Sequence, residues 1–428
     1  MSDTLRALGD EGVTVKLGDV ANEEAAQYGK PLDGVRVLAL EQMQALPYAT
    51  QLLSRLGAEV VKIEAPTGES GRGSQPGMVD PEGRFIGATF LRNNLSKKSV
   101  TVDLKQDAGR ELVLALAPHF DVFAENFKSG ALDRMGLGYD DVAAVHPSVI
   151  YASLSGFGAS GSPYTDWPAY ASIAESMSGI YDYVLIGDET PRPNPVGALG
   201  DISSGLFATV GILAALRHRD RTGEGQRVDI AMYDATVAMT DIVTNFASMG
   251  KYRLNEPKNA ILDPFRASDG WFVMQLVREH QLERIAQLVG HPEWPTDPRL
   301  ATREGWAAHL EDMLRPAIEE WASHMTKLEA VHQLSAAGIA AAPVQTAQEV
   351  LADPHLDQRN MLVEMERSDG VEKPVVIPGN PVKMSKVAEG PESRVPWVGE
   401  HTRSVLHDEL GLDDDAIDKL VADGVVTD

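Results

Sequence analysis

Residues 195–216, with the sequence PVGALGDISSGLFATVGILAAL, predict a long apolar helix and contain one carboxylate, Asp201. An Asp just before a helix is a favoured N-cap, because its carboxylate accepts hydrogen bonds from the free N–H groups of the first turn. The same position can also hold an ionised, poorly solvated carboxylate that acts as a nucleophile. This stretch alone leaves both interpretations of Asp201 open.

Strands and helices alternate on both sides of this stretch. Strands are expected at 34–40, 58–64, 99–105, 121–127 and 148–158, helices at 47–57 and 107–120, and a further strand and Asp-capped helix within 221–239. Strands that alternate with helices in this way predict an α/β fold, in which a doubly wound parallel sheet is covered by helices on both faces.

The pattern of predicted strands and helices changes twice along the chain, which predicts more than one domain. Residues 1–32 are polar and without periodic pattern, so we expect an N-terminal extension on the surface. Residues 245–345 are mostly helical around one clear strand at 270–276 and predict a smaller α+β domain. The large domain is expected to combine residues 33–244 with residues 346–428. That second segment carries expected strands at 375–379 and 380–385 and helices at 399–411 and 413–424.

Composition excludes several functions. The formal net charge of −25 repels nucleic acid and anionic lipid, so neither is expected as a partner. The absence of cysteine excludes disulfides, thiolate metal sites and a cysteine nucleophile, and it fits a cytoplasmic protein. The N-terminus lacks the pattern of a signal peptide, and the apolar runs fall short of the roughly 20 residues that span a membrane.

Several common motifs are missing. The Gly-rich segment 68–77 has no Gly-Lys-Ser/Thr and does not join a strand directly to a helix, so it is neither a phosphate loop nor a dinucleotide fingerprint. The chain has no G-x-S-x-G elbow and no H-E-x-x-H zinc motif, and its 11 histidines are scattered. We therefore expect no metal site, and Asp201 gains weight as a functional group.

Seven segments together resemble one family. They are PLDGVRVLAL (31–40), LLSRLGAEVVKIE (52–64), RNNLSKKSVTVDLK (92–105), ENFKSGALDRMGLGYDDV (125–142), GALGDISSGLFATVGILAAL (197–216), TGEGQRVDIAMYDA (222–235) and VGEHTRSVL (398–406). In this order and spacing the chain, from residue 32 to its end, resembles the class III CoA-transferases of the CaiB/BaiF type. That family includes formyl-CoA:oxalate and carnitine CoA-transferases and the 2-methylacyl-CoA racemases.

The resemblance implies a mechanism centred on Asp201. In the family's transferases the Asp of the Gly-Asp pair attacks an acyl-CoA thioester, forms a mixed anhydride and then an aspartyl-CoA thioester. A carboxylic acid acceptor reverses these steps. Gly200 and Gly197 would let the backbone approach the thioester closely. The resemblance also implies a large CoA-binding domain, an interlocked homodimer, and coenzyme A as a substrate portion rather than a tightly bound cofactor.

The resemblance further implies a set of CoA contacts. They are Gln42, Met43, Gln44 and Ala45 at the pantetheine arm and thioester, then Val102, Asp103, Leu104, Lys105, Asn126, Phe127 and Arg134. Gln44 would close over the active Asp, Lys105 and Arg134 would clamp the phosphates, and Phe127 would contact the adenine end. The alternative for Lys105 and Arg134 is that they are solvated surface charges.

Two departures from the family pattern bear on the reaction. The racemase branch has a His two residues after the Trp-Pro pair, where this chain has Tyr170 followed by Ala171. The aromatic matches formyl-CoA transferases and weakens the racemase interpretation, although Tyr170 could also be core packing. The Gly-rich flap of oxalate-using members is replaced at 254–264 by LNEPKNAILDP, which argues against formyl-CoA and oxalate. The alternatives to a CoA-transferase are an acyl-CoA isomerase or racemase, and a CoA-ester binding protein without turnover.

Overall fold

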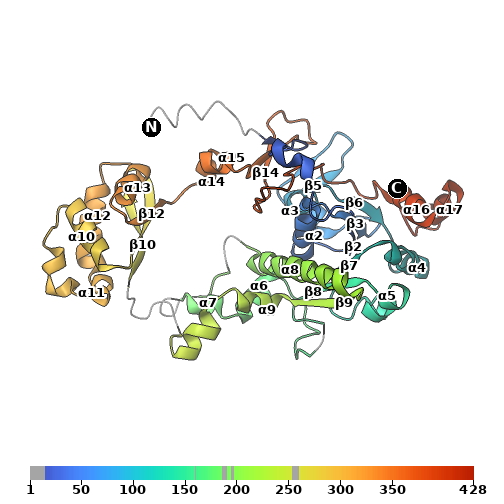
Figure 1. Ribbon diagram of the computed structural model, residues 1–428, viewed down its shortest axis with the longest axis horizontal. Helices are drawn as coiled ribbons and strands as arrows, with labels where there is room; N and C mark the ends of the chain where they lie inside the picture. Colours follow the sequence, from blue (N-terminus) through green and yellow to red (C-terminus); the bar gives the residue numbers. More distant parts are fainter. Residues whose placement is uncertain (1–14, 160, 186–189, 194–196, 253–259) are drawn as a thin grey trace. The chain divides into compact units, whose positions relative to one another are not determined.

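The computed structural model describes residues 15–159, 161–185, 190–193, 197–252 and 260–428. By its contacts the chain divides into two compact units (Figure 1). Unit 1 comprises Met1–Tyr183, Pro191–Gly250 and Pro354–Asp428, and unit 2 comprises Val184–Thr190 and Lys251–Asp353. Unit 1 is thus built from both ends of the chain.

Unit 1 is organised around a six-stranded parallel sheet. Its strands are β2 (Arg36–Leu40), β3 (Glu59–Glu64), β6 (Lys98–Thr101), β7 (Val122–Glu125), β8 (Ile150–Ser155) and β9 (Gln226–Ala231). Their spatial order is β6-β3-β2-β7-β8-β9, and every neighbouring pair is parallel. From β2 the chain adds β3 and then β6 on one side, and it then returns to add β7, β8 and β9 on the other side of β2. The strand order therefore reverses between β2 and β7. The expected α/β fold with a doubly wound sheet is confirmed.

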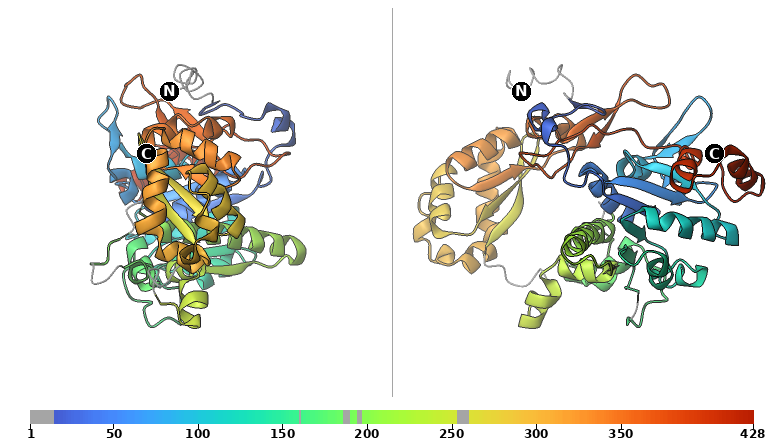
Figure 2. Two further views of the ribbon diagram at one scale, coloured as in Figure 1. Left: turned by 90° about the vertical axis from the view of Figure 1, so that its left-hand side faces the viewer. Right: turned by 45° about the vertical axis from the view of Figure 1, so that its right-hand side comes forward.

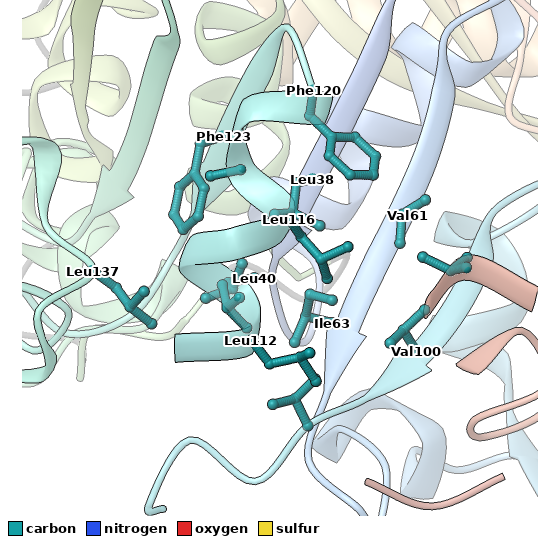
Figure 3. Packing of buried hydrophobic residues seen from close by; sticks show 14 of the residues in the cluster. Leu38, Leu40, Val61, Ile63, Val100, Leu112, Leu116, Phe120, Phe123 and Leu137 are labelled. Carbon is teal, nitrogen blue, oxygen red and sulfur yellow. The ribbon is translucent and has the colours of Figure 1, made fainter. Parts of the chain in front are cut away.

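Helices cover both faces of this sheet, as the alternation of side chains along its strands requires. One face, with Val37 and Ala39 of β2, packs against α2 (Ala45–Arg55), α6 (Ala171–Met177), α8 (Leu199–Thr222) and α9 (Met232–Ala238). The other face packs against α4 (Asp107–Leu116), α5 (Tyr139–Val145), α16 (Thr402–Leu410) and α17 (Asp414–Ala422). Figure 3 shows Leu112 and Leu116 of α4 beside Leu40 and Ile63 of the sheet.

Helix α8 is the central apolar element of unit 1. It is 24 residues long. Its buried side carries mainly small residues, whereas Leu206, Phe207 and Val210 on another side are exposed. Among the described residues it is the one helix long and apolar enough to cross a membrane, and half of its most apolar stretch is buried inside the protein. The buried apolar residues of α8 are part of the core of unit 1.

Several short elements differ from the sequence prediction. Part of the extension expected to lack a pattern forms β1 (Val15–Lys16), paired with β13 (Leu362–Met365), and η1 (Glu23–Tyr28). A hairpin of β4 (Gly77–Val79) and β5 (Phe85–Gly87) begins at the last residue of the Gly-rich segment. The predicted strand at 380–385 is wrong. These residues follow β14 (Val375–Pro378) without strand pairing, and Pro381 removes a main-chain donor.

Unit 2 is a three-stranded antiparallel sheet with helices (Figure 2). The strands are β10 (Ile261–Ala267), β11 (Gly270–Leu276) and β12 (Ala340–Pro343), and the helices are α10 (Glu279–Leu288), α11 (Arg303–Ala308), α12 (Arg315–Ala322) and α13 (Lys327–Ala336). Between α11 and α12 the chain makes a turn at His309 and one π-helical stretch, η9 (Leu310–Leu314), and Pro316 lies in the first turn of α12. This α+β arrangement matches the expectation for the smaller unit.

The remaining elements are short connections. They are η2 (Ser70–Gly73), α3 (Ala88–Asn93), η3 (Ala117–His119), η4 (Asp133–Met135), α7 (Ile180–Tyr183), η5 (Ile242–Phe246), η6 (Ala247–Met249), η7 (Trp294–Thr296), η8 (Pro298–Leu300), η9 (Leu310–Leu314), α14 (Ala347–Leu351) and α15 (Pro354–Gln358).

A buried group of charges lies beside the carboxyl end of β2. The Lys97 ammonium donates to Glu41 Oε1 at 2.7 Å, to Thr50 Oγ1 at 2.7 Å and to the Pro47 carbonyl at 3.0 Å. Burial alone would raise the pKa of Glu41, but the ammonium groups of Lys97 and Lys62 hold it below its usual range. Because both charges are removed from water, each depends on the other for stability.

Replacing Lys97 by Met should therefore destabilise the protein strongly, by about 3–5 kcal/mol, because it leaves Glu41 buried without its closest cation. Lys98→Met is a matched control in the next residue, where the side chain is 39% exposed and its ammonium pairs with Glu59 at 3.2 Å. Its expected cost is about 1 kcal/mol or less. Urea unfolding of both variants checks this, and equal losses would show that the buried group does not contribute in this way.

Candidate active site

A cavity of ≈ 390 Å³ lies in unit 1 at the carboxyl ends of β2, β7 and β8. Its walls come from residues 42–45 after β2, residues 126–129 after β7, residues 154–156 at the end of β8, and residues on α8 and α9. Parallel sheets of this kind bind ligands outside the carboxyl ends of their strands, at the point where the strand order reverses. That point is between β2 and β7, so the topology itself places the cavity.

Asn126 joins the two strands at this point. Its Oδ1 accepts a hydrogen bond from the Gln42 N–H at 2.9 Å, and its Nδ2 donates to the Gln42 carbonyl at 2.9 Å. The amide of Asn126 therefore spans the gap between β7 and the segment that follows β2. Its observed contribution is to fix the backbone of Gln42 on the cavity wall.

Met43 holds the next part of that wall in an unusual backbone conformation. Its φ of 61° is in the left-handed region, which a side chain with a Cβ rarely adopts. The Met43 N–H donates to Glu69 Oε2 at 3.0 Å, and Glu69 Oε1 lies 3.3 Å from the buried Lys62 ammonium. Such strained residues persist where the surroundings over-determine them, and they concentrate at functional sites.

Asp201 reaches the cavity from the first turn of α8. The N-cap residue of α8 is Ala198, and its side chain makes no hydrogen bond to the helix. Because α8 begins at Leu199, Asp201 is the third helical residue. The interpretation of Asp201 as an N-cap is therefore wrong. Within the described part of the chain, no donor is hydrogen-bonded to its carboxylate, and that carboxylate lines the cavity.

The first turn of α8 is instead capped by a residue from α6. Glu175, which is 2% exposed, accepts a hydrogen bond from the Gly200 N–H at 3.0 Å through Oε1. Burial, and to a smaller extent the neighbouring Glu175 carboxylate, together raise the pKa of Asp201 to about 6. At pH 7 Asp201 is still about nine-tenths ionised. The site therefore presents an ionised carboxylate that is more basic than an ordinary Asp.

Glycines let α8 approach its neighbours closely. A Cβ on Gly205 would lie only 2.7 Å from the Ala45 carbonyl oxygen in the first turn of α2. Asp201 is one turn earlier on the same face of α8, so it faces the start of α2, where Gln44 lies. A Cβ on Gly200 would lie 3.1 Å from Ala171 at the start of α6. The space beside buried Gly200 is thus filled by protein, and its N–H is already bonded to Glu175.

Tyr170 is an open part of the cavity wall. It is 71% exposed and stands at the N-cap position of α6, so the alternative that it packs in the core is wrong. Trp167, 52% exposed, lies beside it on the same wall. The cavity wall therefore carries an aromatic side chain at position 170, where the resemblance led us to compare this chain with the racemases.

The cavity brings together most, but not all, of the expected site residues. Those that line it are Gln42, Met43, Gln44, Ala45, Asn126, Phe127, Tyr170 and Asp201. Those placed elsewhere are Val102, Asp103, Leu104 and Lys105, which follow β6 two strands away, Arg134 in η4, and Gly200. The Asp103 N–H donates to the Val425 carbonyl, and the side chains of Lys105 and Arg134 are exposed. Of the segment 254–264, which was expected to replace the family's Gly-rich flap, residues 254–259 lie outside the described residues.

Eleven of the residues that line the cavity were not predicted, and three of these are polar residues at or just after the ends of β7 and β8. Lys128 and Ser129 line the cavity just after Phe127. They follow the carboxyl end of a predicted strand, and that position could have identified them as site residues from the sequence. Ser155, at the end of β8, also lines it, and its buried Oγ has no hydrogen-bond partner among the described residues. In the described part of the chain, no group of three or more His, Asp or Glu side chains could hold a metal ion.

The chain resembles known proteins over almost its whole length. A family model described as CoA-transferase family III matches residues 32–402. The formyl-CoA:oxalate CoA-transferase of Streptomyces avermitilis is 34% identical over 419 residues, covering 93% of this chain and 100% of that protein. The succinyl-CoA:mesaconate CoA-transferase of Haloarcula hispanica is 34% identical over 395 residues, with coverages of 89% and 96%. The crystal structure of a CaiB/BaiF family protein from Brucella suis matches with a TM-score of 0.78 and 32% identity, covering 89% of this chain and 99% of that one.

The close approach of α8 to α2 can be tested with Gly205→Ala. The new Cβ would meet main-chain oxygen, so α8 and α2 must separate. We expect a loss of about 1–3 kcal/mol in unfolding free energy. We also expect about a tenfold to hundredfold loss of activity, because Asp201 moves away from the residues around Gln44.

Gly211→Ala is the matched control on the same helix. Its Cβ would meet the Val228 side chain at 2.6 Å, on the sheet side and away from α2. A similar loss of stability with nearly normal activity is expected. Equal activities in the two variants would show that the approach of α8 to α2 does not align the site.

Proposed function

The chain belongs to CoA-transferase family III and is an enzyme that transfers coenzyme A, and we propose that it does so through a covalent intermediate on Asp201. The observation that carries the proposal is the state of the Asp201 carboxylate. It lines the cavity, no described donor is hydrogen-bonded to it, and the first turn of its helix is capped by Glu175 instead. A carboxylate in that state is free to attack an acyl carbon.

The first half of the reaction moves coenzyme A onto the enzyme. One oxygen of Asp201 attacks the thioester carbon of the donor acyl-CoA, the C–S bond breaks, and the CoA thiolate leaves as a mixed anhydride forms. The thiolate then attacks the Asp201 carbonyl carbon. The anhydride C–O bond breaks, the donor acid departs as a carboxylate with one oxygen from Asp201, and an aspartyl-CoA thioester remains.

The second half returns Asp201 to its starting state. The carboxylate of the acceptor acid attacks the aspartyl-CoA carbon and expels the thiolate, which gives a second mixed anhydride. The thiolate then attacks the acceptor's acyl carbon and forms the new acyl-CoA. The bridging oxygen, which came from the acceptor, stays on Asp201. No proton is transferred in any step, so the chemistry requires no general base.

The residues around Asp201 would hold the thioester. We assign Gln42, Met43, Gln44 and Ala45 to the pantetheine arm, with Gln44 covering the active carboxylate from the start of α2. Tyr170 supplies an exposed ring at the cavity wall, and Gly200 belongs to the same helical turn as Asp201. The free Oγ of Ser155 can donate to an acyl or carboxylate oxygen in the cavity.

The remainder of the acyl-CoA would extend outward from the cavity. The further assigned contacts are Asn126 and Phe127 at its wall, with Val102, Asp103, Leu104, Lys105 and Arg134 outside it. Exposed Lys105 and Arg134 would supply positive charge for the CoA phosphates in a chain of net charge −25. Lys128 adds a third cation, on the cavity wall itself.

The substrates proposed are an acyl-CoA donor and a small carboxylic acid acceptor. The two relatives named above have formyl-CoA with oxalate and succinyl-CoA with mesaconate in their names. None of the described residues that line the cavity is a histidine, which favours transfer over racemisation. Since the chain contains no cysteine, a cytoplasmic location is part of the proposal.

Asp201→Asn tests the role of the carboxylate. The amide retains the shape of Asp but cannot form the anhydride, so kcat should fall by about a thousandfold or more, with little change in KM for the acyl-CoA. The folded state raises the pKa of Asp201 to about 6, so ionisation of Asp201 costs stability as pH rises through that value. The variant should therefore melt at or above the temperature of the wild type at pH 8.

Asp220→Asn is the control, since it makes the same exchange at an exposed residue near the other end of α8. It should leave kcat and KM unchanged. A folded Asp201→Asn protein with nearly normal turnover would exclude the covalent mechanism.

We further propose that the enzyme is an interlocked homodimer. Leu206, Phe207 and Val210 of α8 share one face and are 41%, 39% and 63% exposed. An exposed apolar face of this kind is typical of an interaction surface. Interlocked chains cannot separate by simple dilution, so native mass spectrometry should find dimers from micromolar to nanomolar protein. A monomer at micromolar concentration would contradict the proposal.

A further inference from the structure

Glu175 is a buried carboxylate that the chemistry of transfer does not use. It lies on α6, is 2% exposed, and makes two side-chain hydrogen bonds. Oε1 accepts from the Gly200 N–H at 3.0 Å, and Oε2 accepts from the Tyr181 hydroxyl at 2.6 Å. A carboxylate removed from water needs such partners, so its position between α7 and α8 is fixed.

The bond to Gly200 gives Glu175 a direct connection to Asp201. Gly200 and Asp201 are consecutive residues in the first turn of α8, where main-chain N–H groups have no partner within the helix. Caps for such groups usually come from the residue just before the helix, but Ala198 has no side chain that can serve. Glu175 fills this position from another helix.

We infer that Glu175 is a positioning residue for Asp201: it caps the first turn of α8 so that the Asp201 carboxylate stays free, and its negative charge keeps that carboxylate strongly nucleophilic. This inference rests on the proposed function. Glu175 thus caps the helix, and the Asp201 carboxylate remains available to react with the substrate. A single Asp at the start of the helix could not fill both roles, because a capping carboxylate is held by the N–H groups.

Charge supports the same assignment. Burial raises the pKa of Asp201, and Glu175 is the one ionisable group that raises it further. The other charged side chains on elements packed against α8 or α6 are Arg55 on α2, Asp182 on α7, Asp234 on α9, and Arg227 and Asp229 on β9. None of these shifts the pKa of Asp201. Like charges that share a site disfavour ionisation, and the more basic carboxylate is the better nucleophile.

Glu175→Gln separates the charge from the hydrogen bonds. The amide oxygen can still accept from the Gly200 N–H, and the amide N–H₂ can donate to the Tyr181 hydroxyl. The protein should fold normally and keep its KM for the acyl-CoA. The rise of kcat/KM with pH, which follows ionisation of Asp201, should move down by about half a pH unit or more, because the opposing charge is gone.

Glu175→Ala removes both contributions. With the cap lost, kcat should fall by about tenfold or more while Glu175→Gln retains most of it, and this rescue by the isosteric residue identifies the capping role. Glu224→Gln is the matched control, because it removes the same charge from an exposed residue just beyond the other end of α8. Its pH profile should coincide with that of the wild type.

The outcomes separate this inference from the proposed function. If Asp201→Asn abolishes turnover but Glu175→Gln leaves the pH profile of kcat/KM unchanged, the inference about Glu175 is wrong and the covalent mechanism stands. Equal kcat in Glu175→Ala and Glu175→Gln would remove the capping role. If Asp201→Asn retains turnover, the proposed function itself fails, whatever the Glu175 variants do.

Discussion

The approach of α8 to the first turn of α2 is the contact on which the site depends. Gly205 has no side chain, so α8 can lie directly against the Ala45 carbonyl oxygen. The two helices start at the same end of unit 1, where the strand order reverses between β2 and β7 and the cavity lies. The contact therefore brings a segment near residue 44 and another near residue 201, which are far apart in the chain, to the same cavity wall.

Around this contact, charge is distributed with a clear division of roles. The buried ammonium groups of Lys97 and Lys62 neutralise Glu41 and Glu69, and Glu69 also accepts a hydrogen bond from the Met43 N–H. Glu175 is held by hydrogen bonds to Gly200 and Tyr181. Against these satisfied carboxylates, Asp201 differs because no described residue donates a hydrogen bond to its side chain. An acid left free in an otherwise satisfied surrounding is available to a substrate.

Much of the fold could be predicted from the sequence, because it depends on local patterns. The alternation of strands and helices gave the parallel sheet, and the resemblance brought Asp201, Gln44 and Tyr170 to attention before any geometry was known. What the pattern could not show depends on contacts between distant segments. The cap from Glu175 comes from a residue 26 positions before Asp201, and the short strand β1 forms only because β13 lies beside it.

The interpretation of Asp201 as a cap was wrong for the same reason. A carboxylate near a helix start is a common cap, and only the structure shows that Glu175 already occupies the Gly200 N–H. Likewise the unpartnered Ser155 hydroxyl and the cavity position of Lys128 follow from the convergence of β7 and β8, which no single segment encodes.

The most direct measurement of the central claim follows one oxygen atom. The wild-type enzyme would turn over unlabelled acyl-CoA with an acceptor acid whose carboxylate carries ¹⁸O, in ordinary water, and the protein would then be digested and weighed by mass spectrometry. Covalent catalysis by Asp201 predicts that the peptide containing residues 197–207 gains heavy oxygen at Asp201, one atom after a single turnover and up to two after many. Efficient turnover with no heavy oxygen in that peptide would contradict the account, because coenzyme A would then pass between the two acids without a bond to the enzyme.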